Sequence, residues 1–191
     1  MVAVRVTMIF HGPFRVATGV ARPGIDAAVD RNDLLPASSL KGLMRDSAEN
    51  LLPGLPGLVE HVFGGARKPT VWAWSSARFP DQPEVRMRVR VSLDEETGAA
   101  KRDHLLYGEE VWARTAEFEV TRHARLPESP LSEDDHLTVL ACAAAGVHSV
   151  GSDRRRGLGW VECTTGDPVV DAALVDRFRA LAANWGQQHA S

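Results

Sequence analysis

Two hydrophobic periods alternate along this chain in a fixed order, and that order restricts its fold more than any other feature. Apolar residues occupy every second position in residues 2–10 and 85–93, which is typical of half-buried strands. They recur at three- and four-residue steps in residues 38–52 and 171–185, which is typical of amphipathic helices. Further strands are predicted at 71–79, with a break at its serines, at 111–120 and at 158–164, and a further helix at 136–147.

The predicted order is strand, helix, two or more strands, helix, strand and a C-terminal helix. A βαββαβ succession is the order of the ferredoxin-like (RRM-like) fold. We therefore predict an α+β protein with a ferredoxin-like core, a long loop before the first helix and a C-terminal helix. At 191 residues the chain is long enough for one domain, which we predict to span 1–191.

The segment 11–35 has neither period and is punctuated by Gly12, Pro13, Gly19, Pro23 and Gly24. Loops of this length inside a small domain are usually functional. We predict a flexible insertion here. Residues 53–70 are also rich in glycine and proline, and residues 94–110 are predicted to be a polar connection between two strands.

Some individual residues have predicted structural roles. Ser38 is a candidate N-cap for the first helix, and Ser132 with Asp135 forms a capping-box pattern before the second. Trp160 lies inside a predicted strand and Trp185 on an apolar helix face, so both are expected to pack in the core.

Composition excludes several classes of protein. The chain is 44% hydrophobic and 25% charged, with a formal net charge of −3, which argues against a general polyanion binder. It has no run of about 18 apolar residues, so we expect no membrane contact. The two cysteines are widely separated, so the sequence predicts a cytoplasmic protein without a zinc site.

The beginning of the first predicted helix has the composition of an anion site. A helix N-terminus offers unpaired N–H groups and a partial positive charge. Here it is joined by two hydroxyl groups, a glycine that admits a close backbone, and two cations four residues apart: Ser38, Ser39, Gly42, Lys41 and Arg45. The alternative is an ordinary capped surface helix with two solvated cations.

A second cationic segment, "GSDRRRGLGWV", joins the second core helix to the last core strand. Glycines allow a tight turn whose N–H groups can bind phosphate, and arginine donates forked hydrogen bonds to phosphate oxygens. Arg154, Arg155, Arg156 and Gly157 are therefore candidate contacts. The alternative is a flexible turn. Arg86, Arg88 and Arg90 either extend this surface or form the solvent side of a strand.

These two segments carry a resemblance to a known family. "LLPASSLKGLMRDSAENLL" is similar to the Pro-x-x-Ser-Leu-Lys-Gly helix of the RAMP superfamily of CRISPR systems, and "GSDRRRGLGWV" resembles its glycine-rich loop. "VSLDEETGAAKRDHLLYGEEVWARTAEFEV" resembles two strands and their connection in the backbone subunits of type III effector complexes. The resemblance covers residue 2 to about residue 165.

The resemblance implies a repeating subunit that binds crRNA through the helix start and the glycine loop. Its implied partners are crRNA, complementary target RNA, copies of itself and other CRISPR effector subunits. It also implies that Asp26 cuts the target RNA with Mg²⁺ or Mn²⁺. From the residues alone, an aspartate in a polar loop is usually a turn former.

Two alternatives remain open. "WSSARF" replaces a Ser-Asp-Ala-like turn of the family, and the missing acidic residue favours a non-catalytic structural subunit that binds crRNA. The other alternative is a metal-independent crRNA-processing endoribonuclease that uses a histidine such as His11 or His148.

Overall fold

The first strand defines the inner and outer faces of the main sheet. In this computed structural model, which describes residues 3–19, 22–93, 98 and 100–189, β1 spans Ala3–Phe10. Its side chains alternate: Val4, Val6, Met8 and Phe10 are buried. The predicted half-buried strand is therefore confirmed.

Four strands form the main sheet in the order β2-β5-β1-β6, and every neighbouring pair is antiparallel. Val6 of β1 lies opposite Phe118 of β5 and Thr165 of β6, so buried positions line up across three strands. The other strands of the sheet are β2 (Trp72–Trp74), β5 (Thr115–Arg122) and β6 (Val161–Thr165).

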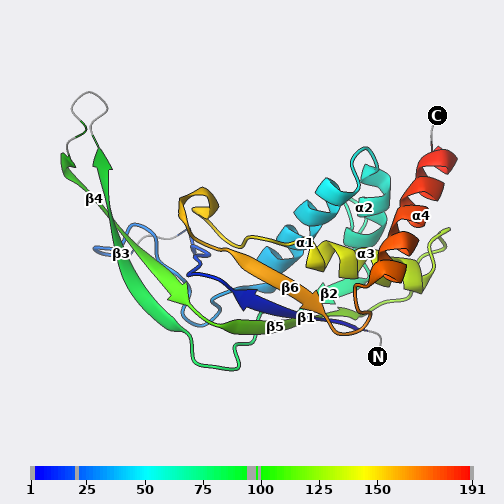
Figure 1. Cartoon of the computed structure of the whole chain (residues 1–191), viewed down its shortest axis with the longest axis horizontal. Coiled ribbons are helices and arrows are strands. Elements are labelled where there is room, and N and C mark those ends of the chain that lie inside the picture. The colour runs from blue at the N-terminus through cyan, green and yellow to red at the C-terminus, as the bar shows by residue number, and fades with distance from the viewer. Residues whose placement is uncertain (1–2, 20–21, 94–97, 99, 190–191) are drawn as a thin grey trace.

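Four helices are seen in the described part of the chain, and they gather at one end of the molecule (Figure 1). Helix α3 (Glu133–Ala145) is the most buried, and it contacts α1, α4, β1 and β6. The others are α1 (Ala37–Leu51), α2 (Pro56–Phe63) and α4 (Ala172–His189). The mixed α/β composition that the sequence predicts is confirmed, and both sheets are antiparallel.

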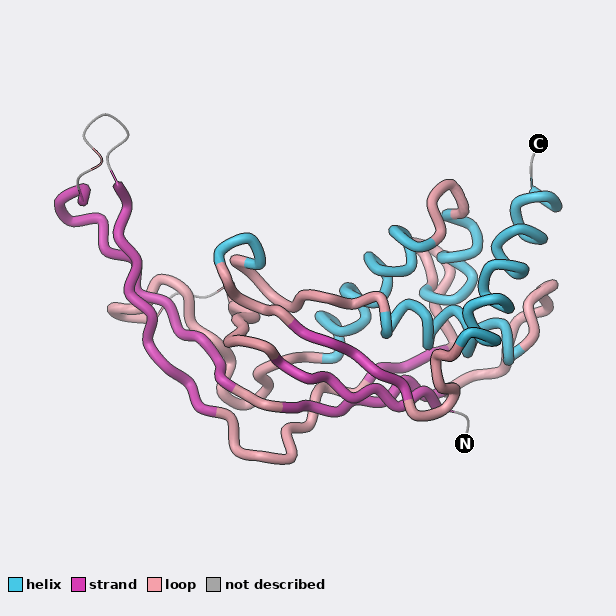
Figure 2. The backbone as a smooth tube through the Cα atoms, viewed as in Figure 1, coloured by secondary structure: helices cyan, strands magenta, loops and turns pink. Residues whose placement is uncertain are grey.

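Strands β3 (Glu84–Leu93) and β4 (Ala100–Trp112) form a separate two-stranded sheet, a long hairpin that extends away from the helices (Figure 2). The predicted polar connection over 94–110 is therefore wrong for residues 100–110, while 94–97 and 99 lie outside the described residues. The alternating pattern was hidden because Glu109 and Glu110 are buried polar residues of the strand.

Three other predicted boundaries change. The predicted strand 111–120 is divided between β4 and β5, because the chain turns at 113–114. The irregular stretch 53–70 contains α2, which begins at Pro56, where the missing N–H costs nothing. The strand at 71–79 breaks at Ser75 and Ser76, as predicted, and pairing with β5 resumes at Arg78.

The segment 11–35 packs along the hairpin without forming a helix or a named strand in its described residues. Phe14 pairs with Val111 and Ala27 with Gly108, so the segment covers the free edge of β4. Phe14, Val29 and Leu35 are fully buried. The flexibility of this insertion stays a prediction.

The two predicted helix caps have opposite outcomes. The capping box of α3 is confirmed, since Asp135 N–H donates to Ser132 Oγ and Ser132 N–H donates to Asp135 Oδ2. Ser38 is not the N-cap of α1, because that helix begins one residue before it and Pro36 holds the cap position. No helix in the described ranges has the length and apolarity needed to cross a membrane.

Candidate nucleic-acid interface

A groove lies between α1 and the glycine-rich loop, and it brings together residues from both predicted anion sites. Its volume is about 290 Å³, and it is lined by Val16, Ser39, Gly42, Leu43, Asp46, Gly151 and Arg154. A second hollow of about 410 Å³ shares Leu43, Asp46 and Arg154 and continues past Asn50, His148 and Ser149. We call these two hollows together the α1–loop groove.

Helix α1 contributes Ser39, Gly42, Leu43 and Asp46 to the smaller hollow of the α1–loop groove. Ser39, Gly42 and Asp46 succeed one another at three- and four-residue steps, so they share one side of the helix. A Cβ built at Gly42 would meet nothing within 4 Å, so the absent side chain leaves open space there. The carboxylate of Asp46 places one negative charge in the same groove.

The first amide of α1 is capped from another part of the chain. Ser76 Oγ accepts a hydrogen bond from Ala37 N–H at 3.3 Å and donates one to Asp33 Oδ2 at 2.8 Å. One of the N–H groups expected to face an anion is therefore already bonded. Ser38 is exposed just beyond this cap.

Lys41 and Arg45 share a side of α1, as their spacing predicts, but they are not among the residues that line the α1–loop groove. Lys41 Nζ lies 5.5 Å from the ring centroid of Trp74. Arg45 donates to Glu49 Oε1 at 2.8 Å and to the carbonyl of Gly64 at 3.0 Å. The structure thus groups Ser39 and Gly42 with Arg154, and it places these two cations against α2 and β2.

The glycine-rich loop follows a path that only glycine allows at two positions. Gly151 has φ +78°, and a Cβ there would lie 2.0 Å from the carbonyl oxygen of Arg15. Gly159 has φ +80°, and a Cβ there would lie 2.0 Å from the carbonyl oxygen of Val150. Between them, Arg154–Arg156 form one exposed 3₁₀ turn, with Gly157 at its end.

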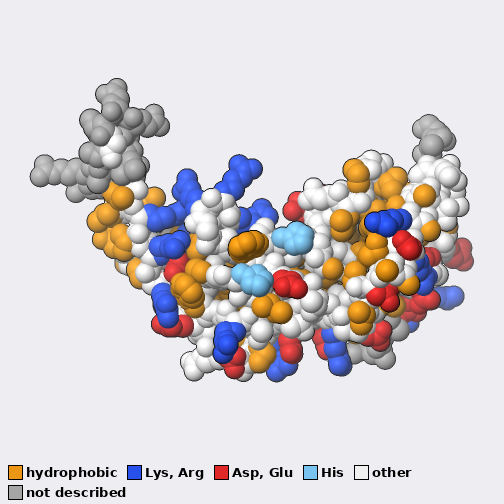
Figure 3. All heavy atoms as spheres, viewed as in Figure 1, with side chains coloured by type: hydrophobic (Ala, Val, Ile, Leu, Met, Phe, Trp, Pro, Cys, Tyr) orange, Lys and Arg blue, Asp and Glu red, His pale blue; other side chains and the backbone are white. Residues whose placement is uncertain are grey.

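Figure 3 shows Lys and Arg side chains gathered between the hairpin and the helices, in the region where Figure 1 draws this loop. Arg154, Arg155 and Arg156 are all exposed. The loop therefore exposes three guanidinium groups, of which Arg154 lines the α1–loop groove, although the net charge of the chain is negative.

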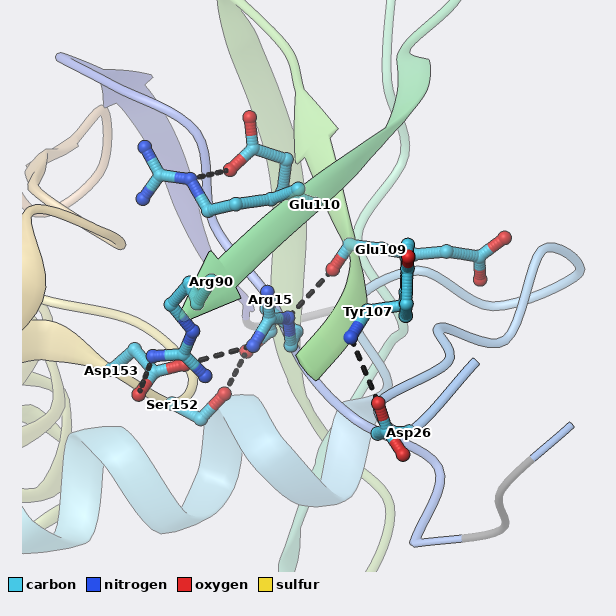
Figure 4. A network of polar contacts seen from close by, with 9 residues as sticks. Arg15, Asp26, Arg90, Tyr107, Glu109, Glu110, Ser152 and Asp153 are labelled. Atoms are coloured by element: carbon cyan, nitrogen blue, oxygen red, sulfur yellow. Dashed lines mark hydrogen bonds and ion pairs between the residues drawn. The ribbon is translucent and has the colours of Figure 1, made fainter. Parts of the chain in front are cut away.

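A buried arginine, which was not among the residues singled out from the sequence, holds the loop in place (Figure 4). Arg15 is 2% exposed; its Nε donates to the Glu109 carbonyl at 2.6 Å and its Nη1 to Asp153 Oδ2 at 2.8 Å. Asp153 also pairs with Arg90 Nη1 at 3.0 Å. Burial lowers the pKa of Arg15, and the nearby Asp153 carboxylate partly opposes that shift. This network ties the loop to the hairpin.

Glu109 forms a second anchor between the hairpin and segment 11–35. Its side chain is almost fully buried and accepts hydrogen bonds from Val29 N–H at 3.0 Å and from Arg31 at 2.6 Å. Burial acts to raise the pKa of Glu109, but the bonds from Arg31 and Val29 outweigh it, so the pKa is lowered. Glu109 is thus a carboxylate held for structure.

The arginine face of β3 is paired with acids. Arg86 contacts Glu84, Arg88 contacts Glu110 at 2.9 Å, and Arg90 contacts Asp153. These pairs neutralise most of the cationic character that the sequence pattern indicates. The sequence left two interpretations of these arginines open, an extension of the anion surface or the solvent side of a strand. The structure favours the second.

Asp26 is exposed and lies where segment 11–35 meets β4 (Figure 4). Its Oδ2 accepts a hydrogen bond from Tyr107 N–H at 2.8 Å. In the described ranges, no three His, Cys, Asp or Glu side chains come together as a metal site. One free carboxylate oxygen fits a Mg²⁺ or Mn²⁺ ion shared with RNA phosphates and water, and it does not fit an ion enclosed by protein.

The two tryptophans expected in the core differ. Trp185 is 5% exposed, so its prediction is confirmed. The prediction for Trp160 is wrong, because its side chain is 70% exposed. The neighbours Gly159 and Val161 are buried, so alternation along the strand turns the indole outward.

Two solved structures have a similar fold. A chain of type III-B Cmr-beta bound to cognate target RNA matches with a TM-score of 0.69 and 12% identity, covering 89% of this chain and 99% of that one. A chain of type III-B Cmr-beta in the apo state matches with a TM-score of 0.64 and 11% identity, covering 88% and 98%. No curated protein sequence matches.

The family comparison covers most of the chain. The model of the RAMP superfamily matches residues 12–162, a range that includes all of segment 11–35 but its first residue, together with α1, the hairpin and the whole glycine-rich loop. Both motifs on which the resemblance was based fall inside this range. The chain is a member of the RAMP superfamily.

Proposed function

We propose that this protein is a repeating backbone subunit of a type III-like CRISPR effector complex and that it binds crRNA along the α1–loop groove. The observation that carries the proposal is the groove itself, which joins Ser39 and Gly42 of α1 to Gly151 and Arg154 of the loop. RAMP membership and the fold shared with type III-B Cmr-beta support the same function.

The groove has the chemistry of an RNA backbone site. A hydroxyl, an open glycine and a guanidinium group can contact phosphate and ribose oxygens, and such contacts carry no base sequence. A subunit that holds guides of any sequence needs this kind of contact. The site extends outward through Arg155, Arg156 and Gly157. An RNA strand that crosses the start of α1 would also contact Ser38, Lys41 and Arg45.

We further propose that the main sheet with α1 and α3 is a ferredoxin-like core. Strands β1 and β2 enclose β5, and strands β5 and β6 enclose β1, so each helix connects two strands with one antiparallel strand between them. This is the split βαβ arrangement. The hairpin and segment 11–35 are then insertions that cooperate with the groove.

The hairpin supports contact with further subunits, including copies of this chain. One of its faces exposes an apolar row in which Val89 lies opposite Tyr107 and Val91 lies opposite Leu105 across β3 and β4, while Met87 stands two positions before Val89 on β3. Contiguous exposed apolar surface commonly marks a protein–protein contact. The row consists of Met87, Val89, Val91, Leu105 and Tyr107, each at least 37% exposed.

Asp26 is the proposed site of target RNA cleavage. Its hydrogen bond to Tyr107 fixes the carboxylate, and its exposure leaves it open to an RNA bound against the hairpin. A Mg²⁺ or Mn²⁺ ion held by Asp26 and the RNA would stabilise charge on the phosphate oxygens. The chain's own contribution is to place one carboxylate at the edge of β4.

Binding is tested by salt titration with labelled single-stranded RNA. Each lost phosphate contact should reduce the slope of log Kd against log salt by about 0.7. We expect this loss for Arg154→Gln, whereas Arg179→Gln on α4 should leave the slope unchanged. Equal slopes for wild type and Arg154→Gln would remove the groove from the RNA path.

Cleavage is tested with the assembled complex, Mg²⁺ and RNA complementary to the guide. The complex with Asp26→Asn should bind crRNA normally but give no cleavage product. The complex with Asp30→Asn, a change in the same segment, should cleave the target RNA like wild type. Unchanged cleavage by Asp26→Asn would contradict the catalytic role, and no product even from wild type would favour a purely structural subunit. Metal-independent cutting of precursor RNA by the isolated chain would favour the processing endoribonuclease.

A further inference from the structure

Trp160 is an exposed indole beside the α1–loop groove, and the strand geometry explains its position. Val150 N–H donates to Gly159 O at 2.8 Å, and Val161 N–H donates to His148 O at 3.1 Å. These bonds flank the bridge between Ser149 and Trp160, which makes it a non-hydrogen-bonded pair, the kind in which opposite side chains stand closest.

The partner of Trp160 in this pair belongs to the groove. Ser149 lines the larger hollow, and its Oγ lies 3.5 Å from Arg154 Nη1. The indole therefore emerges one strand spacing from the hollow that holds the Arg154 guanidinium group. It is the most exposed large apolar side chain in the part of the chain that the structure describes, so burial in the core does not account for an indole in this place.

The other side of Trp160 is defined by His11 and Glu162. His11 N–H donates to Trp160 O at 2.9 Å, and the two rings meet edge-on with centroids 6.0 Å apart. Glu162 Oε2 lies 3.7 Å from His11 Nε2. The indole therefore lies between opposite charges: the Arg154 guanidinium group on the groove side and the Glu162 carboxylate beyond His11.

We propose that Trp160 is a stacking platform for one base of a single-stranded RNA whose phosphates lie at Arg154. The proposal rests on the function proposed above and adds a base contact to it. A phosphate is attracted to Arg154 and repelled by Glu162, so the RNA backbone stays in the groove. The uncharged base then stacks on the indole of Trp160. Stacking accepts every base, which suits a guide of variable sequence.

The test compares two RNA probes of equal length, an oligouridylate and an abasic ribose–phosphate chain, by fluorescence anisotropy. Trp160→Ala should weaken binding of the oligouridylate roughly 5- to 150-fold and leave the abasic probe unchanged. Trp160→Phe should keep most of the affinity, because it keeps an aromatic face. Trp112→Ala, which removes a 38% exposed tryptophan from the hairpin, is the matched control and should bind like wild type.

The results separate this proposal from the one on which it rests. If Trp160→Ala binds both probes like wild type while Arg154→Gln binds both more weakly, the platform is wrong and the groove stands. If the wild-type protein binds neither probe, the RNA-binding function and the platform are both wrong. Quenching of tryptophan fluorescence by oligouridylate, present in Trp112→Ala and absent in Trp160→Ala, would support the platform directly.

Discussion

Arg15 and Asp153 are 138 residues apart in the chain, yet Arg15 Nη1 lies 2.8 Å from Asp153 Oδ2. Their ion pair joins segment 11–35 to the glycine-rich loop. Arg90 of the hairpin forms an ion pair with the same Asp153 carboxylate. The three parts of the molecule that surround the proposed RNA path are thus held by one acidic residue.

Asp153→Asn should lower the free energy of unfolding by about 3 kcal/mol, because it leaves the buried Arg15 charge unpaired. Asparagine accepts the left-handed backbone at this position, where φ is +59°, so the change isolates the charge. Urea denaturation measures the effect. Asp176→Asn removes an exposed partner of Arg179 and should change stability by less than about 0.5 kcal/mol. Equal effects of the two variants would contradict a structural role for Asp153.

Gly151→Ala should destabilise the protein by about 3 kcal/mol or more, since the new methyl group would meet the Arg15 carbonyl and the backbone has positive φ. Gly157→Ala shares the positive φ but has open space, so we expect a loss of only about 1 to 2 kcal/mol. Thermal unfolding of the two variants separates crowding from backbone strain. A smaller loss at Gly151 than at Gly157 would show that the loop moves away freely.

Gly42→Ala should move stability and RNA affinity in opposite directions. Alanine in a helix interior is favoured over glycine by up to about 1 kcal/mol, and the methyl group meets no neighbour here. The same methyl enters the α1–loop groove, where it should cost about 1 to 3 kcal/mol of RNA binding. Thermal unfolding and anisotropy on one preparation measure both. Undiminished affinity would show that RNA does not approach Gly42.

Asp46→Asn should strengthen RNA binding about 2- to 5-fold at low salt, because it removes a negative charge from the groove that we propose receives phosphate. The gain should shrink as salt rises. Glu60→Gln on α2 changes the net charge equally at an exposed position away from the groove and serves as the control. An equal gain from the control would indicate a net-charge effect alone.

Acid should weaken the fold through His136. This side chain is fully buried, and its Nδ1 accepts a hydrogen bond from Trp72 Nε1–H at 3.1 Å. Burial lowers its pKa from 6.5 to about 4, with a smaller contribution from the charge of His61. The unfolded chain therefore takes up a proton at a higher pH than the folded protein does, so stability is complete above pH 6.5 and falls as the pH drops toward 4.

The expected loss is about 2 kcal/mol between pH 7 and pH 5, measured by urea denaturation at each pH. His136→Gln keeps an acceptor for the Trp72 indole and removes the titration, so its stability should be nearly constant over this range. A parallel decline in wild type and His136→Gln would assign the acid sensitivity to another group.

The sequence predicts those parts of the fold that follow local rules. Alternation locates β1, the three- and four-residue steps locate α1, and the capping box marks the start of α3. Residues whose environment is formed by distant segments escape such rules. Glu109 and Glu110 look like solvent-exposed residues until Arg31 and Arg88 come close, and Trp160 looks like a core residue until the sheet turns it outward.

The candidate site shows the same division. The sequence identifies Ser39, Gly42 and Arg154 because glycine, hydroxyl and cation cluster locally. It also nominates Lys41 and Arg45, whose orientation depends on Trp74 and Glu49. Nothing near Arg15 marks it as a buried anchor. One indirect signal is Gly108, where a Cβ would lie 2.6 Å from Arg15 Nη2, but the meaning of that glycine depends on the fold.

The two crowded glycines of the loop have a consequence for how such a subunit can diversify. Gly151 and Gly159 fix the chain where it enters and leaves the loop, whereas the side chains of the turn at 154–156 are exposed to solvent. Substitutions or short insertions at 154–156 can therefore change what the loop presents without disturbing the frame beneath. The three arginines can therefore be replaced without loss of the fold, provided that both ends of the loop stay fixed.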